Sequence, residues 1–238
     1  MSTERLGVLA SGRGSNFEAI LDHIELGVLE NVEVGYLISD NPDARALQVA
    51  EKNEIPNQTV EAKEEEKDKE FEKRISEIFE KNNVSLVILA GFMRIVSPYL
   101  IEKYRGKIMN IHPALLPSFK GLDAQRQALN YGVKVSGCTV HYASEEVDAG
   151  PIILQHPVPV LEDDTEDTLS DRILVFEHRL YSKAIQLHAD DRLEIVEGRV
   201  RIDLSGNWEE KWREKQEIFI DRQKRVWEEK EVFEGVWE

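Results

Sequence analysis

An amide and an imidazole stand two residues apart in a short stretch just before the middle of the chain. Asn110 and His112 follow the apolar pair Ile108-Met109, which indicates a buried strand, and Pro113 then blocks its continuation. Residues i and i+2 of a strand share a face, so both side chains point the same way. An amide N–H can stabilise an oxyanion and an imidazole can move a proton, so the pair favours chemistry over a merely capped strand end.

A glycine-rich turn near the N-terminus is a second candidate site. Gly12, Gly14, Ser15 and Asn16 lie between an apolar strand and an amphipathic helix. Glycines let a ligand approach the backbone, and the first N–H groups of a helix favour an anion. The dinucleotide pattern G-x-G-x-x-G fails because Phe17 occupies its third glycine position. The turn therefore predicts a phosphate site, with a tight turn and helix cap as a nearly equal alternative.

Two further loops follow predicted strands. Residues 90–96 contain Gly91, against which a flat ligand could lie, but on these residues alone an ordinary β–α loop with an extended Arg94 is the preferred interpretation. Residues 140–150 end in Asp148-Ala149-Gly150, and the Asp148 carboxylate could raise the pKa of a nearby imidazole and fix its tautomer. On the residues alone, Asp148 is more simply a turn residue. No set of Cys and His has zinc spacing, and three histidines are assigned to the core or surface: His23, His156 and His188.

Strands alternate with helices along most of the chain. We expect strands at residues 6–10, 32–38, 56–60, 86–90, 108–112, 136–142 and 152–160, and a hairpin at 193–202. We expect helices at residues 17–27, from 40–42 to 50, from the charged run 62–70 through 79, and at 97–104, 124–131 and 165–185. This order predicts an α/β fold with a doubly wound, mostly parallel sheet and an antiparallel C-terminal part. Three prolines place the last long strand at an edge.

The C-terminal segment differs from the rest in composition. It is highly charged with sparse aromatic residues, and Trp208 and Trp212 are spaced as on one face of a helix. We expect a domain over residues 1–203 and a helical extension over 204–238. The aromatic stripe should pack on its own domain, with a partner subunit, hence a possible homodimer, as the alternative.

Composition limits the classes of partner. The 238 residues carry a net charge of −16, which argues against nucleic acid or an anionic membrane. No apolar run approaches the ~20 residues of a membrane span, and the start has no secretory core. Cys138 is the single cysteine, so no disulfide can form within the chain. We therefore expect a cytoplasmic protein that binds small molecules, with a local set of N–H donors for any anionic substrate.

Taken together, these motifs resemble the folate-dependent glycinamide ribonucleotide formyltransferases of purine synthesis. The matching stretches are SGRGSN at 11–16, LAGFMRI at 89–95, NIHPALLP at 110–117, GCTVH at 137–141, VDAG at 147–150 and EH at 177–178. They occur in the family's order and span about residues 6–202. The resemblance implies a Rossmann-like formyltransferase fold and formyl transfer from 10-formyltetrahydrofolate to the ribonucleotide amine. Folate would be a co-substrate, and no metal would be needed.

The resemblance also implies roles for individual residues. Asn110 would stabilise the oxyanion, His112 would act as general acid, and Asp148 would keep His112 protonated and oriented. The ribonucleotide would be bound by Gly14, Ser15, Asn16 and Glu177. The folate would be bound by Met93, Arg94, Ile95, Val96, Asn110, Ser144, Glu145, Glu146, Val147 and Asp148.

The chain departs from the family pattern in places, and related activities compete. Asp68 falls where many members carry a folate-binding Arg, and residues 174–176 replace more polar ones. A formyltetrahydrofolate hydrolase would carry an extra N-terminal domain, for which about five residues leave no room. Methionyl-tRNA formyltransferase would need a basic C-terminal domain. A non-catalytic folate- or nucleotide-binding protein is a further alternative, against which the intact Asn110, His112 and Asp148 argue.

Overall fold

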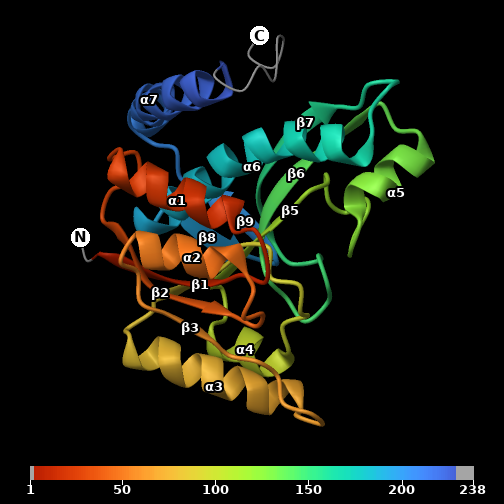
Figure 1. The fold of residues 1–238 in the computed structure, drawn as a ribbon. Helices are drawn as coiled ribbons and strands as arrows, with labels where there is room; N and C mark the ends of the chain where they lie inside the picture. The colour runs from red at the N-terminus through yellow and green to blue at the C-terminus, as the bar shows by residue number, and fades with distance from the viewer. Residues whose placement is uncertain (1–2, 229–238) are drawn as a thin grey trace.

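The computed structural model describes residues 3–228, which form a seven-stranded sheet covered by helices on both faces (Figure 1). Its strands are β1 Glu4–Leu9, β2 Val32–Ser39, β3 Asn57–Thr59, β4 Leu86–Leu89, β5 Ile108–His112, β6 Val135–Tyr142 and β7 Ile152–Pro159. They lie in the order β3-β2-β1-β4-β5-β6-β7. Strands β1 to β5 pair in parallel, whereas β6 and β7 each run antiparallel to their neighbour. The predicted fold class is confirmed, and β7 is an edge strand as expected.

Helices pack on both faces of this sheet. They are α1 Ser15–Glu25, α2 Arg45–Lys52, α3 Asp68–Lys81, α4 Pro98–Lys103, α5 Ala124–Tyr131, α6 Glu166–Ala189 and α7 Trp208–Glu228. Figure 1 shows α3 and α4 on one side, and α1, α2 and α6 on the other. The apolar run of β4 serves both faces, because Leu86 and Ile88 enter the core under α1 and α6 while Val87 and Leu89 enter the core over α3. A separate hairpin, β8 Leu193–Val196 with β9 Arg199–Ile202, confirms the predicted one.

Two predicted helix starts are wrong. Helix α2 begins at Arg45 rather than at 40–42, because the Asn41 side chain accepts the Asp43 N–H at 3.0 Å and holds a turn there. Helix α3 begins at Asp68, and most of the charged run before it is a loop. Arg74 ties that loop down with an ion pair to Glu66 at 2.6 Å. A side-chain bond to the local backbone competes with the helix at both positions, since Glu66 Oε2 also accepts the Lys63 N–H at 2.9 Å.

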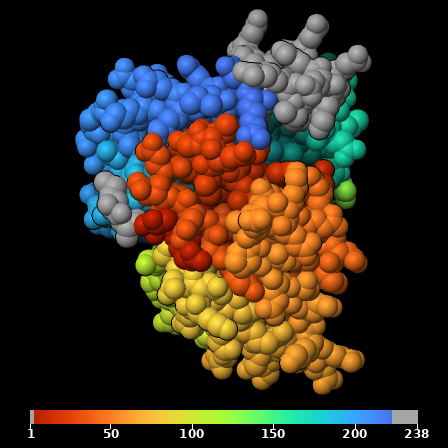
Figure 2. All heavy atoms as spheres, turned by 60° about the vertical axis from the view of Figure 1, so that its left-hand side comes forward, coloured from red at the N-terminus to blue at the C-terminus, as the bar shows by residue number. Residues whose placement is uncertain are grey.

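Helix α7 packs on the domain that precedes it. Trp208, Trp212 and Phe219 are buried in a cluster with Ala19 of α1 and Leu187 of α6. Figure 2 shows the C-terminal residues (blue) against the N-terminal segment (red). This arrangement confirms the prediction that the aromatic stripe packs on its own chain. The side chain of Trp227, and Phe233 and Trp237, lie outside the described residues, and the division at residue 203 stays a prediction.

The structure also bears on membrane insertion. Within residues 3–228, each helix is too short or too polar to cross a bilayer.

Candidate functional site

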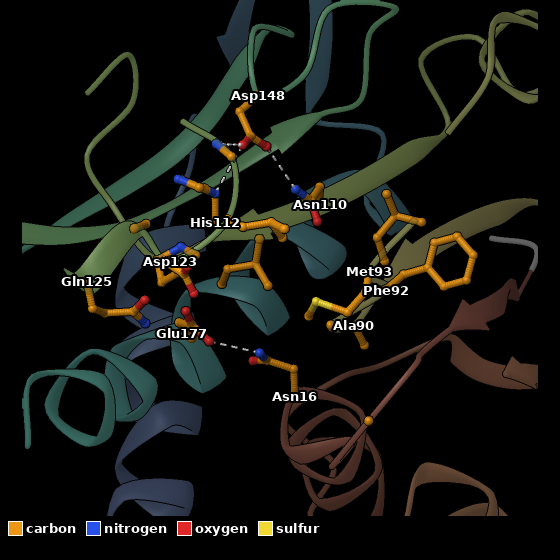
Figure 3. Close-up of a pocket in the computed structure, with 18 of the residues that line it drawn as sticks. Asn16, Ala90, Phe92, Met93, Asn110, His112, Asp123, Gln125, Asp148 and Glu177 are labelled. Carbon is orange, nitrogen blue, oxygen red and sulfur yellow. Dashed lines mark hydrogen bonds and ion pairs between the residues drawn. The ribbon is translucent and has the colours of Figure 1, made fainter. Parts of the chain in front are cut away.

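A cavity of about 630 Å³ opens where β1, β4 and β5 end (Figure 3). Its wall includes the turn at Gly12–Asn16, the loop after β4, and Asn110 and His112 of β5. The carboxyl ends of parallel strands meet at one edge of a sheet, which explains how three segments distant in sequence share this cavity. Asp148 reaches the same wall from the loop after β6.

The three predicted catalytic side chains lie together. His112 Nδ1 is 3.3 Å from Asp148 Oδ2, and His112 Nε2 donates to the Phe119 carbonyl at 2.8 Å. Asp148 Oδ2 also accepts the Gly121 N–H at 2.8 Å, and Asp148 Oδ1 lies 3.5 Å from Asn110 Nδ2. Both nitrogens of His112 therefore face acceptors. A second proton on the ring would complete an ion pair with Asp148.

Burial and the Asp148 carboxylate act in opposite directions on the pKa of His112. Burial lowers the pKa of His112, and the Asp148 carboxylate offsets that only in part. Burial alone would raise the pKa of Asp148, but the neighbouring His141 ring and the hydrogen bond from the Gly121 N–H bring it below its usual range. Asp148 is thus a carboxylate at neutral pH. That Asp148 keeps His112 protonated stays a prediction, because the carboxylate raises the pKa of His112 while burial lowers it.

One site residue, His141, was missed in the sequence. It lies directly across from Asn110 in the antiparallel β5–β6 pair, and its side chain is only 2% exposed. Its Nε2 is 3.2 Å from Asn110 Nδ2 and 3.6 Å from Asp148 Oδ1. The stretch 137–141 carried the signal. The position of His141 beside Asn110 depends on the register between β5 and β6, which the residues alone do not give.

The glycine turn leads directly into helix α1. Gly14 is its N-cap with a left-handed backbone (φ 72°), and a Cβ there would lie 2.8 Å from the Ala46 Cβ, so only glycine fits. Asn16 Nδ2 donates to Glu177 Oε2 at 2.9 Å. Among the described residues, Asn16 Oδ1 is buried without a hydrogen-bond partner. Burial raises the pKa of Glu177. Ser15 stands at the start of α1, so the predicted ribonucleotide-binding residues lie at one end of the cavity.

The predicted folate-binding residues separate into two groups. One group lines the cavity and includes Met93, Ile95 and Val147. These three residues are 63%, 70% and 40% exposed. Arg94, Val96 and Ser144 line it too. Glu145 and Glu146 lie outside its wall; both are exposed, and Glu146 pairs with Lys120 at 2.9 Å. Their contact with folate stays a prediction.

Arg94 is already engaged in this structure. Its Nη2 lies 2.9 Å from Asp68 Oδ1, and its guanidinium stands 4.6 Å above the Phe71 ring. Asp68, which falls where the resemblance implies a folate-binding Arg, thus forms an ion pair with Arg94. This contact depends on residues 26 apart in sequence, and the sequence did not predict it.

The opposite wall carries polar side chains that the sequence did not single out. They are Asp123, Gln125, Glu166, Ser170 and Asp171. Within residues 3–228, no group of three or more His, Cys, Asp or Glu side chains is arranged to hold a metal ion.

Known proteins resemble this chain in sequence and in fold. The family model for formyl transferases matches residues 4–185. The chain is 43% identical over 185 residues to phosphoribosylglycinamide formyltransferase of Bacillus subtilis, which covers 77% of this chain and 93% of that protein. The solved glycinamide ribonucleotide transformylase 1 of Symbiobacterium toebii matches with a TM-score of 0.82 and 46% identity, over 84% of this chain and 94% of that one.

A larger human protein matches as well. The trifunctional purine biosynthetic protein adenosine-3 of Homo sapiens is 42% identical over 193 residues, which is 81% of this chain. The chain spans only 19% of the length of that relative.

Proposed function

Since this chain belongs to the formyl transferase family, we propose that it transfers a formyl group from 10-formyltetrahydrofolate to the amine of glycinamide ribonucleotide. The observation that carries the proposal is a single cavity that holds Asn110, His112 and Asp148 and also reaches the Gly14 turn. Two docked small molecules would meet beside His112, which supplies proximity. The reaction places the protein in purine biosynthesis.

The ribonucleotide phosphate would bind at the start of α1. The N–H groups that follow Gly14 have no carbonyl partner within the helix, and the helix dipole favours an anion there. Such a local cradle is required because the net charge of −16 repels anions at long range. Asn16 Oδ1 and Glu177 lie deeper in the cavity and would accept hydrogen bonds from the ribose or the glycinamide.

The folate would occupy the other end. Met93, Ile95 and Val147 give that end an exposed apolar surface, and the backbone around Gly91 leaves room for a flat ring. Val96, Ser144 and the paired Arg94 complete this wall. The folate carries the formyl group in as a co-substrate.

The chemistry needs one bond to form, one to break and one proton to move. The amine attacks the formyl carbon, and the carbonyl oxygen becomes an oxyanion that Asn110 N–H stabilises. The bond from that carbon to the folate nitrogen then breaks, and a proton lost by the amine must reach the departing nitrogen. His112 carries out that transfer, and Asp148 stabilises the imidazolium while it exists.

The decisive experiment incubates the purified chain with glycinamide ribonucleotide and 10-formyltetrahydrofolate. We expect loss of the formyl group from folate only when the ribonucleotide is present, and formation of one formylated product per folate released. Formyl loss without the ribonucleotide would indicate the hydrolase. Binding of both compounds without turnover would indicate a non-catalytic binding protein. The His112→Ala variant is the matched control for contaminating activity.

A further inference from the structure

We propose that His141 is a positioning residue that fixes the Asn110 amide with an N–H group toward the reacting carbonyl. This inference rests on the proposed function. His141 is buried in β6 directly opposite Asn110, and Figure 3 shows the Asn110 amide nitrogen turned toward Asp148. An asparagine side chain that is free to turn could present its oxygen instead, which would repel an oxyanion.

The hydrogen bonds of His141 define its tautomer. Its Nδ1 lies 3.0 Å from the Tyr142 carbonyl oxygen. A carbonyl only accepts, so Nδ1 carries a proton. In the neutral ring Nε2 is then an unprotonated acceptor, 3.2 Å from Asn110 Nδ2. His141 therefore takes one of the two amide protons of Asn110 and excludes the orientation with the oxygen in that place.

The second amide proton of Asn110 is the one left for catalysis. Its nearest acceptor is Asp148 Oδ1 at 3.5 Å, at the outer limit for a hydrogen bond. A developing negative charge on the formyl oxygen would compete well with so long a contact. His141 acts through Asn110 and need not touch either substrate.

Substitutions at His141 test this role, because two amides mimic its two nitrogens separately. In His141→Gln the longer side chain can return an acceptor near the Nε2 position, whereas in His141→Asn the amide reaches only the Nδ1 position. We expect His141→Asn to lower kcat on the order of 10- to 100-fold, the usual effect of losing a group that orients a site side chain, with both KM values nearly unchanged. His141→Gln should recover most of that loss.

A double-mutant cycle separates positioning from general structural damage. In the Asn110→Ala background, His141→Asn should lower kcat no further, since its effect passes through Asn110. An equal loss in both backgrounds, or a KM rise with a parallel fall in melting temperature, would overturn the inference.

Nitrogen-15 NMR of the free protein tests it without any turnover. We expect His141 to be protonated on Nδ1 and unprotonated on Nε2. The opposite tautomer would sink the inference and leave the proposed function standing. Conversely, the expected tautomer in a chain that transfers no formyl group would overturn the proposed function, and of the inference it would leave only the orientation of the Asn110 amide.

Discussion

Two buried histidines in different parts of the molecule make nearly the same hydrogen bonds. His23, under α7, has Nδ1 2.6 Å from the Ala19 carbonyl oxygen and Nε2 3.3 Å from the Gln216 amide nitrogen. His141, at the cavity, has Nδ1 near a carbonyl and Nε2 near the Asn110 amide nitrogen. Each ring thus has a carbonyl on one side and a side-chain amide on the other.

The two clusters differ in charge. Around His23 lie the Ser182 hydroxyl and the stacked Phe219 ring, and burial lowers the pKa of His23 to about 4, with Arg179 lowering it further. The cavity adds Asp148, 3.3 Å from His112 and 3.6 Å from His141. Burial alone makes a histidine a neutral packing group. A buried carboxylate beside it makes a proton transferable, and that distinguishes the site from the core.

The largest expected effect on kcat comes from removing the imidazole of His112. His112→Ala should lower kcat by roughly 10²- to 10⁴-fold, the usual contribution of a general acid, with a smaller change in KM. Steady-state assays would measure both constants. His156→Ala is the control, because His156 stacks on Phe176 away from the cavity and should leave kcat unchanged. Equal losses in the two variants would contradict the assignment.

Removing only the charge should have the next largest effect. Asp148→Asn keeps the shape but loses the carboxylate that raises the pKa of His112. We expect kcat to fall on the order of 10- to 100-fold. Because the pKa of His112 then drops further, the limb of the kcat/KM profile that reports His112 should move to lower pH. A profile that stays in place would show that the two groups are not coupled.

His23, Ser182, Gln216 and Phe219 form the packing cluster. It should make the stability of the fold sensitive to acid. The neutral form of His23 is favoured in the folded state, so stability is full above its unfolded pKa of 6.5 and declines as pH falls from there toward about 4. At pH 5 this one group should cost about 2 kcal/mol. Urea unfolding at pH 7.5 and pH 5 would measure it. His23→Phe should reduce the difference between the two pH values, and an unchanged difference would contradict this account.

A substitution of equal shape would carry the carboxylate into the packing cluster. Gln216→Glu places an acidic oxygen 3.3 Å from His23 Nε2 in place of the amide. The pKa of His23, followed by NMR, should rise well above that of the unaltered chain, because the ring can now donate from Nε2. A pKa that does not move would mean that burial, rather than the missing carboxylate, sets the difference between the two clusters.

The sequence could predict features that depend on local geometry, but it could not predict those that depend on long-range strand pairing. The shared direction of Asn110 and His112 needs only strand geometry, and the parallel order of β1 to β5 follows from alternating strands and helices. The place of His141 depends on the turn to an antiparallel pair after β5. No local pattern determines that register.

Backbone geometry around His112 was equally hidden. Phe119 and Asp148 both have left-handed backbones (φ 53° and 50°), which non-glycine residues seldom adopt. In these conformations the Phe119 carbonyl reaches His112 Nε2 and the Asp148 carboxylate reaches Nδ1. The motif therefore identified the catalytic side chains, while their hydrogen-bond partners required the folded loops.

The packing of α7 on α1 also has a consequence for synthesis. The ribosome makes α1 early and α7 late, yet Trp212 and Phe219 cluster with Ala19, and Phe219 stacks on His23. The side of α1 that faces α7, with Ala19 and His23, therefore stays uncovered by α7 until residues 208–222 have been translated. This contact between α1 and α7 can therefore form only after every strand of the sheet has been translated.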